Sequence, residues 1–370
     1  MEKNIKVYID LESIYSKSNQ TYNEDYMNIC IQFTKIADLV VVHSDVIEFK
    51  EVIKHLNNRI KNVNFLACDS IENIVLDEPN QKAVLVISSI YTEVKIIRNI
   101  IKLSLDFDFV HNKFLNTSFV EAAKEKLIYN LFSDDFSFLI NKDTMKEFEF
   151  IQSVLQKNNL CSGKILDCCC GVGRHDILLS NQGYEILGID ISQSQIATAK
   201  RTNKNNLVDY IVGDIRNYKP HYEQFDAAIC MWTSFNYLSR KEMDVFFDNI
   251  YNGLKNNSIF ILDTKNFISP IEYKLYSKEL VKGTKKVHIF VIKRVKNKIQ
   301  TSKYIYFIYD IINRQTEFFV DNEIINIYTK EDILDMAQNK FTIIKVYGDY
   351  DATPYDEKKS DRMILVLRKL

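Results

Sequence analysis

Glycine is absent from the first 162 residues of this 370-residue chain, and all nine glycines follow that stretch. A loop that lies against a cofactor, or that adopts a positive φ, normally needs glycine at that point. The first part of the chain therefore has no glycine-rich cofactor loop. We expect cofactor chemistry to lie after residue 160.

Composition narrows the class of protein. At about 150 residues per domain, the length predicts two or three domains. Lys and Arg number 48 against 49 Asp and Glu, so no overall positive field attracts nucleic acid or an anionic membrane. No apolar run approaches the ~20 residues that span a bilayer, and the start lacks a signal-peptide core. Seven cysteines, an odd number in a large chain, favour a reduced, cytoplasmic location.

Apolar runs alternate with helical patterns in the glycine-free part. We expect strands at Ile5–Ile9, Ile36–Val42, Val63–Ala67 and Ala83–Ile87, and helices at about Asn23–Thr34, Val46–Ile60 and Thr92–Leu105. This alternation predicts a parallel sheet with crossover helices over about residues 1–112. Residues 113–160 are predicted to be helical and to link this domain to the part that contains the glycines.

The most informative motif covers residues 164–175, Lys-Ile-Leu-Asp-Cys-Cys-Cys-Gly-Val-Gly-Arg-His. An apolar strand ends in Asp167, a turn carries Gly171 and Gly173, and an amphipathic helix follows. Glycine lets a ligand approach the backbone of the turn, and the N–H groups at the helix start favour an anion such as a carboxylate. This arrangement predicts a cofactor site.

Acidic residues end the next two predicted strands. Asp190 follows the second strand, close to the ~20 residues after the glycine turn expected of an acid that binds ribose hydroxyls. A dinucleotide fingerprint would place Gly or Ala where Asp176 stands, and an acid there would face a pyrophosphate. S-adenosylmethionine has no phosphate and carries cationic groups, so the pattern favours it. Asp214, after the third strand, is placed to accept from an adenine amine.

Two further strands, 225–231 and 259–263, end in polar or aromatic residues. In an open α/β sheet the ligand crevice lies outside the carboxyl ends of the strands. All five strand ends therefore have the chemistry that a crevice at this edge requires.

Residues 163–266 resemble class I S-adenosylmethionine-dependent methyltransferases. The matching stretches are Ile165–His175, Leu187–Ser192 and Val212–Asp214; residues 127–136 and 346–366 resemble the cofactor-covering helices and the last strand pair of small-molecule members. The likeness spans about 120–370 and does not include 1–112. It implies a Rossmann-like domain at 161–370. Strand patterns predict an antiparallel β lid inserted in it at about 270–326, and the alternation described above predicts the smaller glycine-free α/β domain before it, so we expect an α/β protein.

The resemblance also implies roles for individual residues. Asp167, Cys170, the Gly171/Gly173 turn and Arg174 would hold the methionine end, with Tyr129 covering the cofactor and Met231 beside it. Asp190 with Ile191 would bind the ribose side, and Asp214 with Ile215 the adenine. Cys168 and Cys169 depart from the pattern, which usually has glycine and another small residue there.

The resemblance implies methyl transfer to a small polar metabolite, such as an amino sugar, a sugar or an amino acid, at an amine or a hydroxyl. An amine must lose a proton before it attacks, and the candidates to assist are Tyr237, His288 and Asp349. Residues 270–326 would form a lid that excludes water from the acceptor.

Alternative interpretations concern the basic stretch, the cysteine run and the first domain. Residues 282–303 hold eight basic side chains and no acid, which suits either an RNA-binding face or the solvated side of a sheet. Adjacent cysteines at 168–170 diverge in a strand or turn, so we expect small buried residues and no metal. The chain could instead be a non-catalytic module that binds a partner, or form a homo-oligomer, through residues 1–112.

Overall fold

The computed structural model describes residues 5–16, 20–22, 27, 30, 31, 34, 38–43, 50–60, 63–67, 83–88, 96, 97, 100–104, 143–268, 270–310, 312 and 315–370. The chain divides into two compact units, 1–122 with 272–294 and 302–320, and 123–271 with 295–301 and 321–370. No helix in the described ranges is long and apolar enough to cross a membrane.

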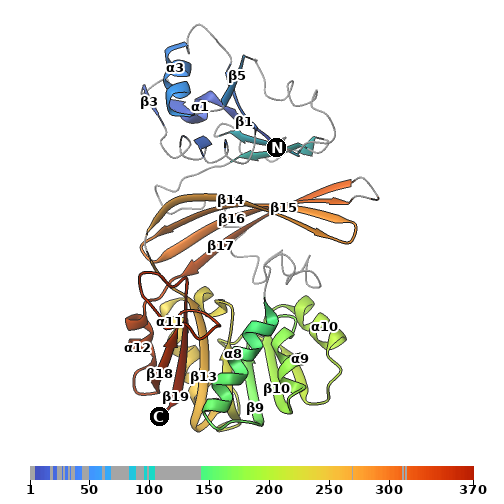
Figure 1. Ribbon diagram of the computed structural model, residues 1–370, viewed down its shortest axis with the longest axis vertical. Helices are drawn as coiled ribbons and strands as arrows, with labels where there is room; N and C mark the ends of the chain where they lie inside the picture. The colour runs from blue at the N-terminus through green and yellow to red at the C-terminus, as the bar shows by residue number, and fades with distance from the viewer. Residues whose placement is uncertain are drawn as a thin grey trace. The chain divides into compact units, whose positions relative to one another are not determined.

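The glycine-free part, drawn in blue to teal in Figure 1, forms a six-stranded sheet in the order β5-β4-β1-β6-β8-β7. Its parallel strands are β1 (Ile5–Asp10), β4 (Asp38–His43), β5 (Val63–Ala67), β6 (Ala83–Ser88) and β8 (Ile100–Ser104). Helices α1 (Leu11–Ile14) and α3 (Lys50–Arg59) and the small β2–β3 pair (Tyr15–Ser16, Thr21–Tyr22) accompany the sheet. The parallel α/β architecture predicted here is present.

The helix predicted at Thr92–Leu105 is wrong. Strand β7 (Ile96–Ile97) pairs antiparallel with β8 at this place. The isoleucines at 96, 97, 100 and 101 have a spacing that fits a helix face, but β-branched side chains pack well on a pleated sheet. These residues form strands because β8 pairs with the edge of the sheet at β6, and β7 pairs with β8. Of the helix predicted at Asn23–Thr34, most residues lie outside the described ranges.

A seven-stranded sheet forms the second unit, in the order β11-β10-β9-β12-β13-β19-β18. The parallel strands are β9 (Gly163–Cys168), β10 (Tyr184–Asp190), β11 (Val208–Val212), β12 (Phe225–Cys230) and β13 (Leu254–Lys265). Strand β19 (Arg362–Lys369) runs antiparallel to both β13 and β18 (Phe341–Tyr347). The strand order reverses at β9, and an open α/β sheet binds its ligand at such a switch point.

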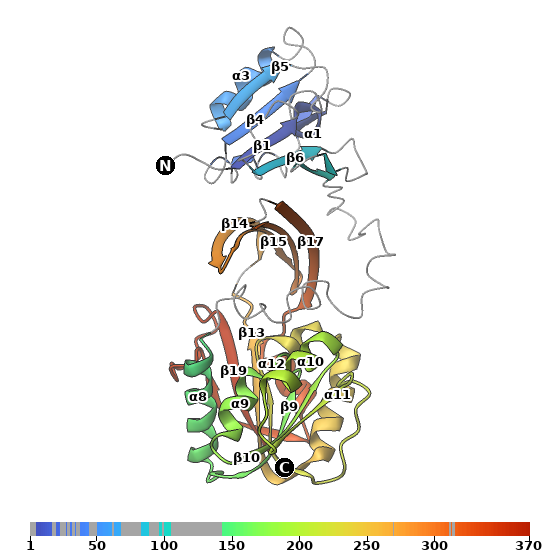
Figure 2. The same cartoon turned by 90° about the vertical axis from the view of Figure 1, so that its right-hand side faces the viewer.

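Helices cover both faces of this sheet (Figure 2). On one face, α8 (Thr144–Lys157) and α9 (Arg174–Ser180) pack with Ile165, Ile186 and Ile229. On the other, α11 (Arg240–Gly253) and α12 (Lys330–Ala337) pack with a phenylalanine-rich cluster around Phe260. Helix α10 (Gln193–Thr202) and the short 3₁₀ helix η1 (Ser234–Tyr237) complete the elements. Two covered faces fit the predicted Rossmann-like domain.

Four long strands are inserted between β13 and α12, as predicted for residues 270–326. They are β14 (Ile271–Lys282), β15 (Lys285–Lys296), β16 (Ile299–Asp310) and β17 (Gln315–Asn326), neighbours in that order. Two-residue connections join β14 to β15 and β15 to β16, which makes these pairs antiparallel hairpins. The alternating Val287, Ile289 and Val291 are buried on β15, which explains the period-two pattern of the basic stretch.

Candidate cofactor and active site

The turn between β9 and α9 adopts left-handed backbone at three positions. Cys169, Gly171 and Gly173 have φ values of 64°, 59° and 71°. Glycine tolerates this conformation without strain, whereas a residue with a side chain rarely adopts it. Cys169 thus stands in a conformation that favours glycine. The backbone N–H of Cys170 donates to Ile189 O (3.0 Å), which fixes the turn to the end of β10.

Asp190 holds this turn from the end of β10. Its Oδ2 accepts from the N–H of Gly171 (2.8 Å), and its Oδ1 accepts from the N–H of Ser192 (2.9 Å). A carboxylate has about four lone-pair positions and can therefore accept from several donors at once. Ile191 beside it is 37% exposed, an apolar surface next to the acid. The pair therefore lies where a nucleoside would meet both a polar and an apolar group.

Asp214 has a different environment from the one predicted. Arg216 donates several hydrogen bonds to its carboxylate. The guanidinium Nε lies 2.9 Å from Oδ1 and 3.0 Å from Oδ2, and Nη2 lies 2.6 Å from Oδ2. The backbone N–H of Arg216 also donates to Oδ1 (2.9 Å). The same guanidinium contacts Glu242. These contacts occupy most of the acceptor capacity of Asp214, so an adenine amine would have to share the carboxylate with Arg216.

Glu147 connects its own helix, α8, to the start of helix α9. Its buried carboxylate contacts Nη2 of Arg174 and lies 2.8 Å from Nε2 of His175, the first two residues of α9. Nη1 of Arg174 donates to Thr144 Oγ1 (3.1 Å). Burial by itself raises the pKa of Glu147, but the hydrogen bond with His175 and the charge of Arg174 outweigh it and lower the pKa to about 2.

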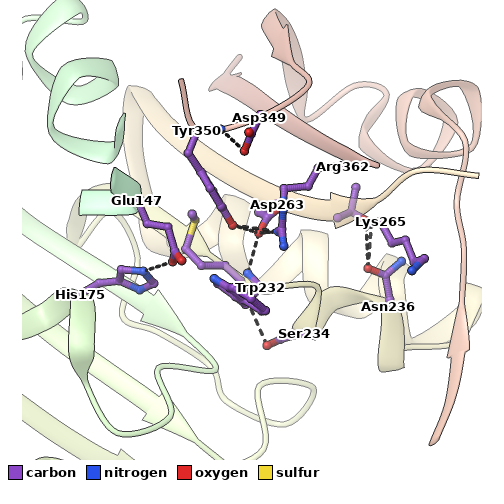
Figure 3. A network of polar contacts seen from close by, with 12 residues as sticks. Glu147, His175, Trp232, Ser234, Asn236, Asp263, Lys265, Asp349, Tyr350 and Arg362 are labelled. Carbon is purple, nitrogen blue, oxygen red and sulfur yellow. Dashed lines mark hydrogen bonds and ion pairs between the residues drawn. The ribbon is translucent and has the colours of Figure 1, made fainter. Parts of the chain in front are cut away.

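A second buried acid, Asp263, lies two residues before the end of β13 and binds three groups from different elements (Figure 3). Its Oδ2 accepts from Trp232 N (2.7 Å), the Tyr350 hydroxyl (2.6 Å) and Arg362 Nη1 (2.5 Å). Burial and the neighbouring charge of Asp263 raise the pKa of Tyr350 well above its ordinary value, so the hydroxyl keeps its proton. Asp263 thereby links the turn after β12 to the last strand of the sheet.

The turn after β12 is strained. Trp232 and Thr233 have φ values of 58° and 62°, and a bulky residue in this region is a genuine outlier. Such strain persists only where the surroundings impose it, and it clusters at functional sites. The Trp232 ring lies 4.9 Å from the Arg362 guanidinium carbon and 5.6 Å from that of Arg174. The indole ring therefore lies between the first residue of α9 and the first residue of β19 and contacts both.

The three predicted proton acceptors are not brought together by the contacts of the described residues. The Tyr237 hydroxyl, at the end of η1, donates to Glu323 Oε1 (2.5 Å). Asp349 accepts from Lys146 Nζ (2.9 Å) and from the N–H of Tyr350 (2.7 Å). His288 lies on β15, and its side chain is outside the described part of the structure.

The remaining predicted cofactor residues lie in or near the core. Met231, directly after β12, Cys170 in the turn and Ile215 after β11 are all buried. Tyr129 lies outside the described residues. Within the described ranges, no group of three or more His, Cys, Asp or Glu side chains could hold a metal ion.

Sequence reasoning missed Glu147, Asp263, Tyr350 and Arg362 as site residues. Asp263 carried a signal, because it ends the fifth strand as Asp190 ends the second. Glu147 looked like one acid among several on an amphipathic helix. Arg362 and Tyr350 reach Asp263 from 99 and 87 residues away in sequence, and no local pattern reports such a contact.

Comparisons with known proteins agree with this geometry. Residues 165–257 match the family model described as a methyltransferase domain. A glycine/sarcosine N-methyltransferase of Aphanothece halophytica is 30% identical over 125 residues, 33% of this chain and 46% of that protein. A dTDP-3-amino-3,6-dideoxy-alpha-D-glucopyranose N,N-dimethyltransferase of Streptomyces fradiae is 26% identical over 104 residues, 28% of this chain and 40% of that protein. The chain spans about half the length of these relatives.

Solved structures match over a larger part of the chain. An S-adenosylmethionine-dependent methyltransferase from Clostridium acetobutylicum superposes with a TM-score of 0.57 at 20% identity, over 65% of this chain and 98% of that one. The amino pentose methyltransferase CalS10 from Micromonospora echinaspora, with S-adenosylmethionine bound, gives 0.53 at 16% identity, over 62% and 92%. These identities establish the fold alone. Residues 165–257 therefore match the methyltransferase domain family model, and the second unit has the Rossmann-like fold of these solved S-adenosylmethionine-dependent methyltransferases.

Proposed function

We propose that this chain transfers a methyl group from S-adenosylmethionine to an amine, or a hydroxyl, of a small polar metabolite such as an amino sugar, a sugar or an amino acid. The family match supports the reaction class. Relatives named as methyltransferases of glycine and sarcosine and of an amino sugar support the acceptor class. We also propose that the protein is located in the cytoplasm. Its proposed domain organisation is an N-terminal α/β domain at 1–112, a helical linker at 113–160 and a methyltransferase domain at 161–370.

One observation carries the proposal: Asp190 ends β10, beside the switch point of the sheet at β9, and holds the glycine turn through Gly171 N–H, with the exposed Ile191 next to it. This donor and acceptor set fits a nucleoside with two ribose hydroxyls. Asp167 also fits a cationic ligand, because its Oδ2 is buried and has no hydrogen-bond partner among the described residues. A neutral or cationic amino-acid end is compatible with that acid, whereas a pyrophosphate is not.

S-adenosylmethionine supplies an electrophilic methyl group on its sulfonium. In the proposed mechanism the chain binds and aligns. Asp190 accepts from the ribose, the Gly171–Gly173 turn lets the ligand reach the backbone, and Arg174 lies at the start of α9 for the methionine carboxylate. Most of the acceleration comes from holding acceptor and methyl in line, which is worth about 7–11 kcal/mol in well-oriented reactions.

The acceptor approaches beside the turn after β12, which Asp263 holds in place. Asp263 neutralises Arg362, and Glu147 neutralises Arg174, so each guanidinium already has a counter-ion. This compensated surface favours an acceptor that reacts as a neutral amine or hydroxyl. Tyr237, Asp349 and His288 remain the proposed groups that could take its proton.

Incubation with methyl-labelled S-adenosylmethionine and a panel of small amines and sugars tests the proposal. With the natural chain, glycine, sarcosine and amino sugars should acquire the labelled methyl group, and mass analysis identifies the product. With Asp190→Ala, no labelled product should form. Absence of S-adenosylmethionine binding in calorimetry would refute the proposal. Binding with transfer only to RNA would replace the small-molecule acceptor, and binding without any transfer would favour a non-catalytic module.

A further inference from the structure

Two acids lie buried next to the glycine turn without the partners that buried carboxylates normally have. Asp167, the next-to-last residue of β9, is 2% exposed, and Asp176, in the first turn of α9, is fully buried. Neither oxygen of Asp176, nor Oδ2 of Asp167, has a hydrogen bond of ordinary geometry within the described ranges. Isolated buried carboxylates are costly, so this arrangement needs a physical explanation.

The two carboxyl groups lie within reach of each other. Burial is the first cause that raises the pKa of Asp167, and the charge of Asp176 and a contact with its carboxyl follow. The Tyr210 hydroxyl also acts on Asp176 through a hydrogen bond. Two ionised carboxylates offer each other no donor, whereas one shared proton supplies a hydrogen bond between them and removes a charge. One shared proton would therefore give both buried carboxyls a partner and leave a single negative charge.

The cation that the described residues bring to the pair is already held by another acid. The charged and titratable groups that act on the two carboxyls and on the adjoining turn come from every element packed around them: Arg174, Cys168, Cys169, Cys170, Asp190, Tyr210 and Cys230. Arg174 carries the positive charge among them, and Glu147 already holds its guanidinium. A ligand that brings a cation to Asp167 would therefore supply what the pair lacks.

We infer that binding of S-adenosylmethionine expels the proton shared by Asp167 and Asp176, which makes Asp176 part of cofactor recognition. The inference rests on the proposed function and deepens it. The α-ammonium of the ligand, next to Asp167, favours the ionised form of the pair. The proton leaves a carboxyl oxygen for solvent, and the ammonium takes its place as the positive partner. By linkage, the affinity for the ligand rises with pH while the pair is titrating.

Calorimetry on the full natural chain tests this inference without an acceptor. Titrations near neutral pH in two buffers of different ionisation enthalpy give the number of protons released on binding. S-adenosylmethionine and S-adenosylhomocysteine, which both carry the ammonium, should each release a number approaching one. Methylthioadenosine, which lacks the amino-acid end, should release none. Equal release with all three ligands, or none with S-adenosylmethionine, would overturn the inference.

Two variants make the assignment specific. In Asp176→Asn an amide donor replaces the like charge, so Asp167 is ionised beforehand and proton release should disappear while binding persists. Asp209→Asn removes an exposed acid on β11 and is the matched control, with release as in the natural chain. Unchanged release in Asp176→Asn would exclude the pair as the source. If Asp176→Asn does not fold, the ligand comparison still decides, and failure of every ligand to bind would refute the proposed function itself.

Discussion

Replacement of Glu147 by glutamine tests the link between α8 and the cofactor helix most directly. The variant keeps the shape of the side chain and removes its charge, so Arg174 and His175 lose a buried counter-ion. Glu147 is 1% exposed, and water cannot replace what is lost. Destabilisation of the domain is therefore expected.

The pKa of Glu147 sets the magnitude. It falls from the ordinary 4.5 to about 2, and at about 1.36 kcal/mol per pKa unit this corresponds to about 3 kcal/mol of folding free energy at neutral pH. The value lies within the range of about 3–5 kcal/mol for breaking a buried ion pair from one side. Because the folded pKa is depressed, the contribution is present above pH 4.5 and is lost as the pH falls toward 2.

Urea unfolding followed by tryptophan fluorescence measures the effect, since Trp232 is the only tryptophan and lies in the same compact unit. Glu147→Gln should unfold about 3 kcal/mol more easily at pH 7, and the difference should shrink at acid pH. Glu149→Gln, an exposed acid on the same helix, is the control and should change little. Equal unfolding free energies for the natural chain and Glu147→Gln would refute the reasoning.

Three further predictions follow from the site. Asp190→Ala should weaken S-adenosylmethionine binding at least tenfold in calorimetry, because it removes the acceptor that holds the glycine turn; unchanged affinity would remove the ribose assignment. Gly173→Ala should destabilise the domain in thermal unfolding and abolish binding, because φ is +71° and a Cβ would lie 2.1 Å from the Tyr210 hydroxyl; a Tm equal to that of the natural chain would contradict this close contact. Tyr350→Phe leaves buried Asp263 with one donor fewer, so we expect a loss of about 1–3 kcal/mol in urea unfolding and an altered Trp232 emission.

The parts of the fold that local pattern determines were predictable from the sequence. Strand ends at Asp167 and Asp190, the glycine turn between β9 and α9, and the inserted strands all follow from periodicity and from glycine placement. The strands within residues 96–104 were not predictable, because isoleucines at helical spacing also suit an edge strand, and pairing with the rest of the sheet determines which structure forms.

Side-chain partners were the harder part of the site. The acid at the end of a strand is visible in sequence, but what binds it is not. Arg216, two residues from Asp214, was a local clue that the carboxylate had a partner within the chain. The contacts of Asp263 with Tyr350 and Arg362 depend on how β19 docks beside β13, and a single sequence does not report that register.

Strand β19 also has a consequence for the order in which the domain assembles. Asp263 is made 99 residues before Arg362, and the whole four-stranded insertion is synthesised in between. Strands β9 to β13 can pair while the chain is still growing, but Asp263 then lacks its counter-ion Arg362. A contact between residues so far apart in sequence forms slowly. The ion pair between Asp263 and Arg362 therefore forms only after β19 has been made, and a nascent chain that ends before β19 has the parallel strands without this buried counter-ion.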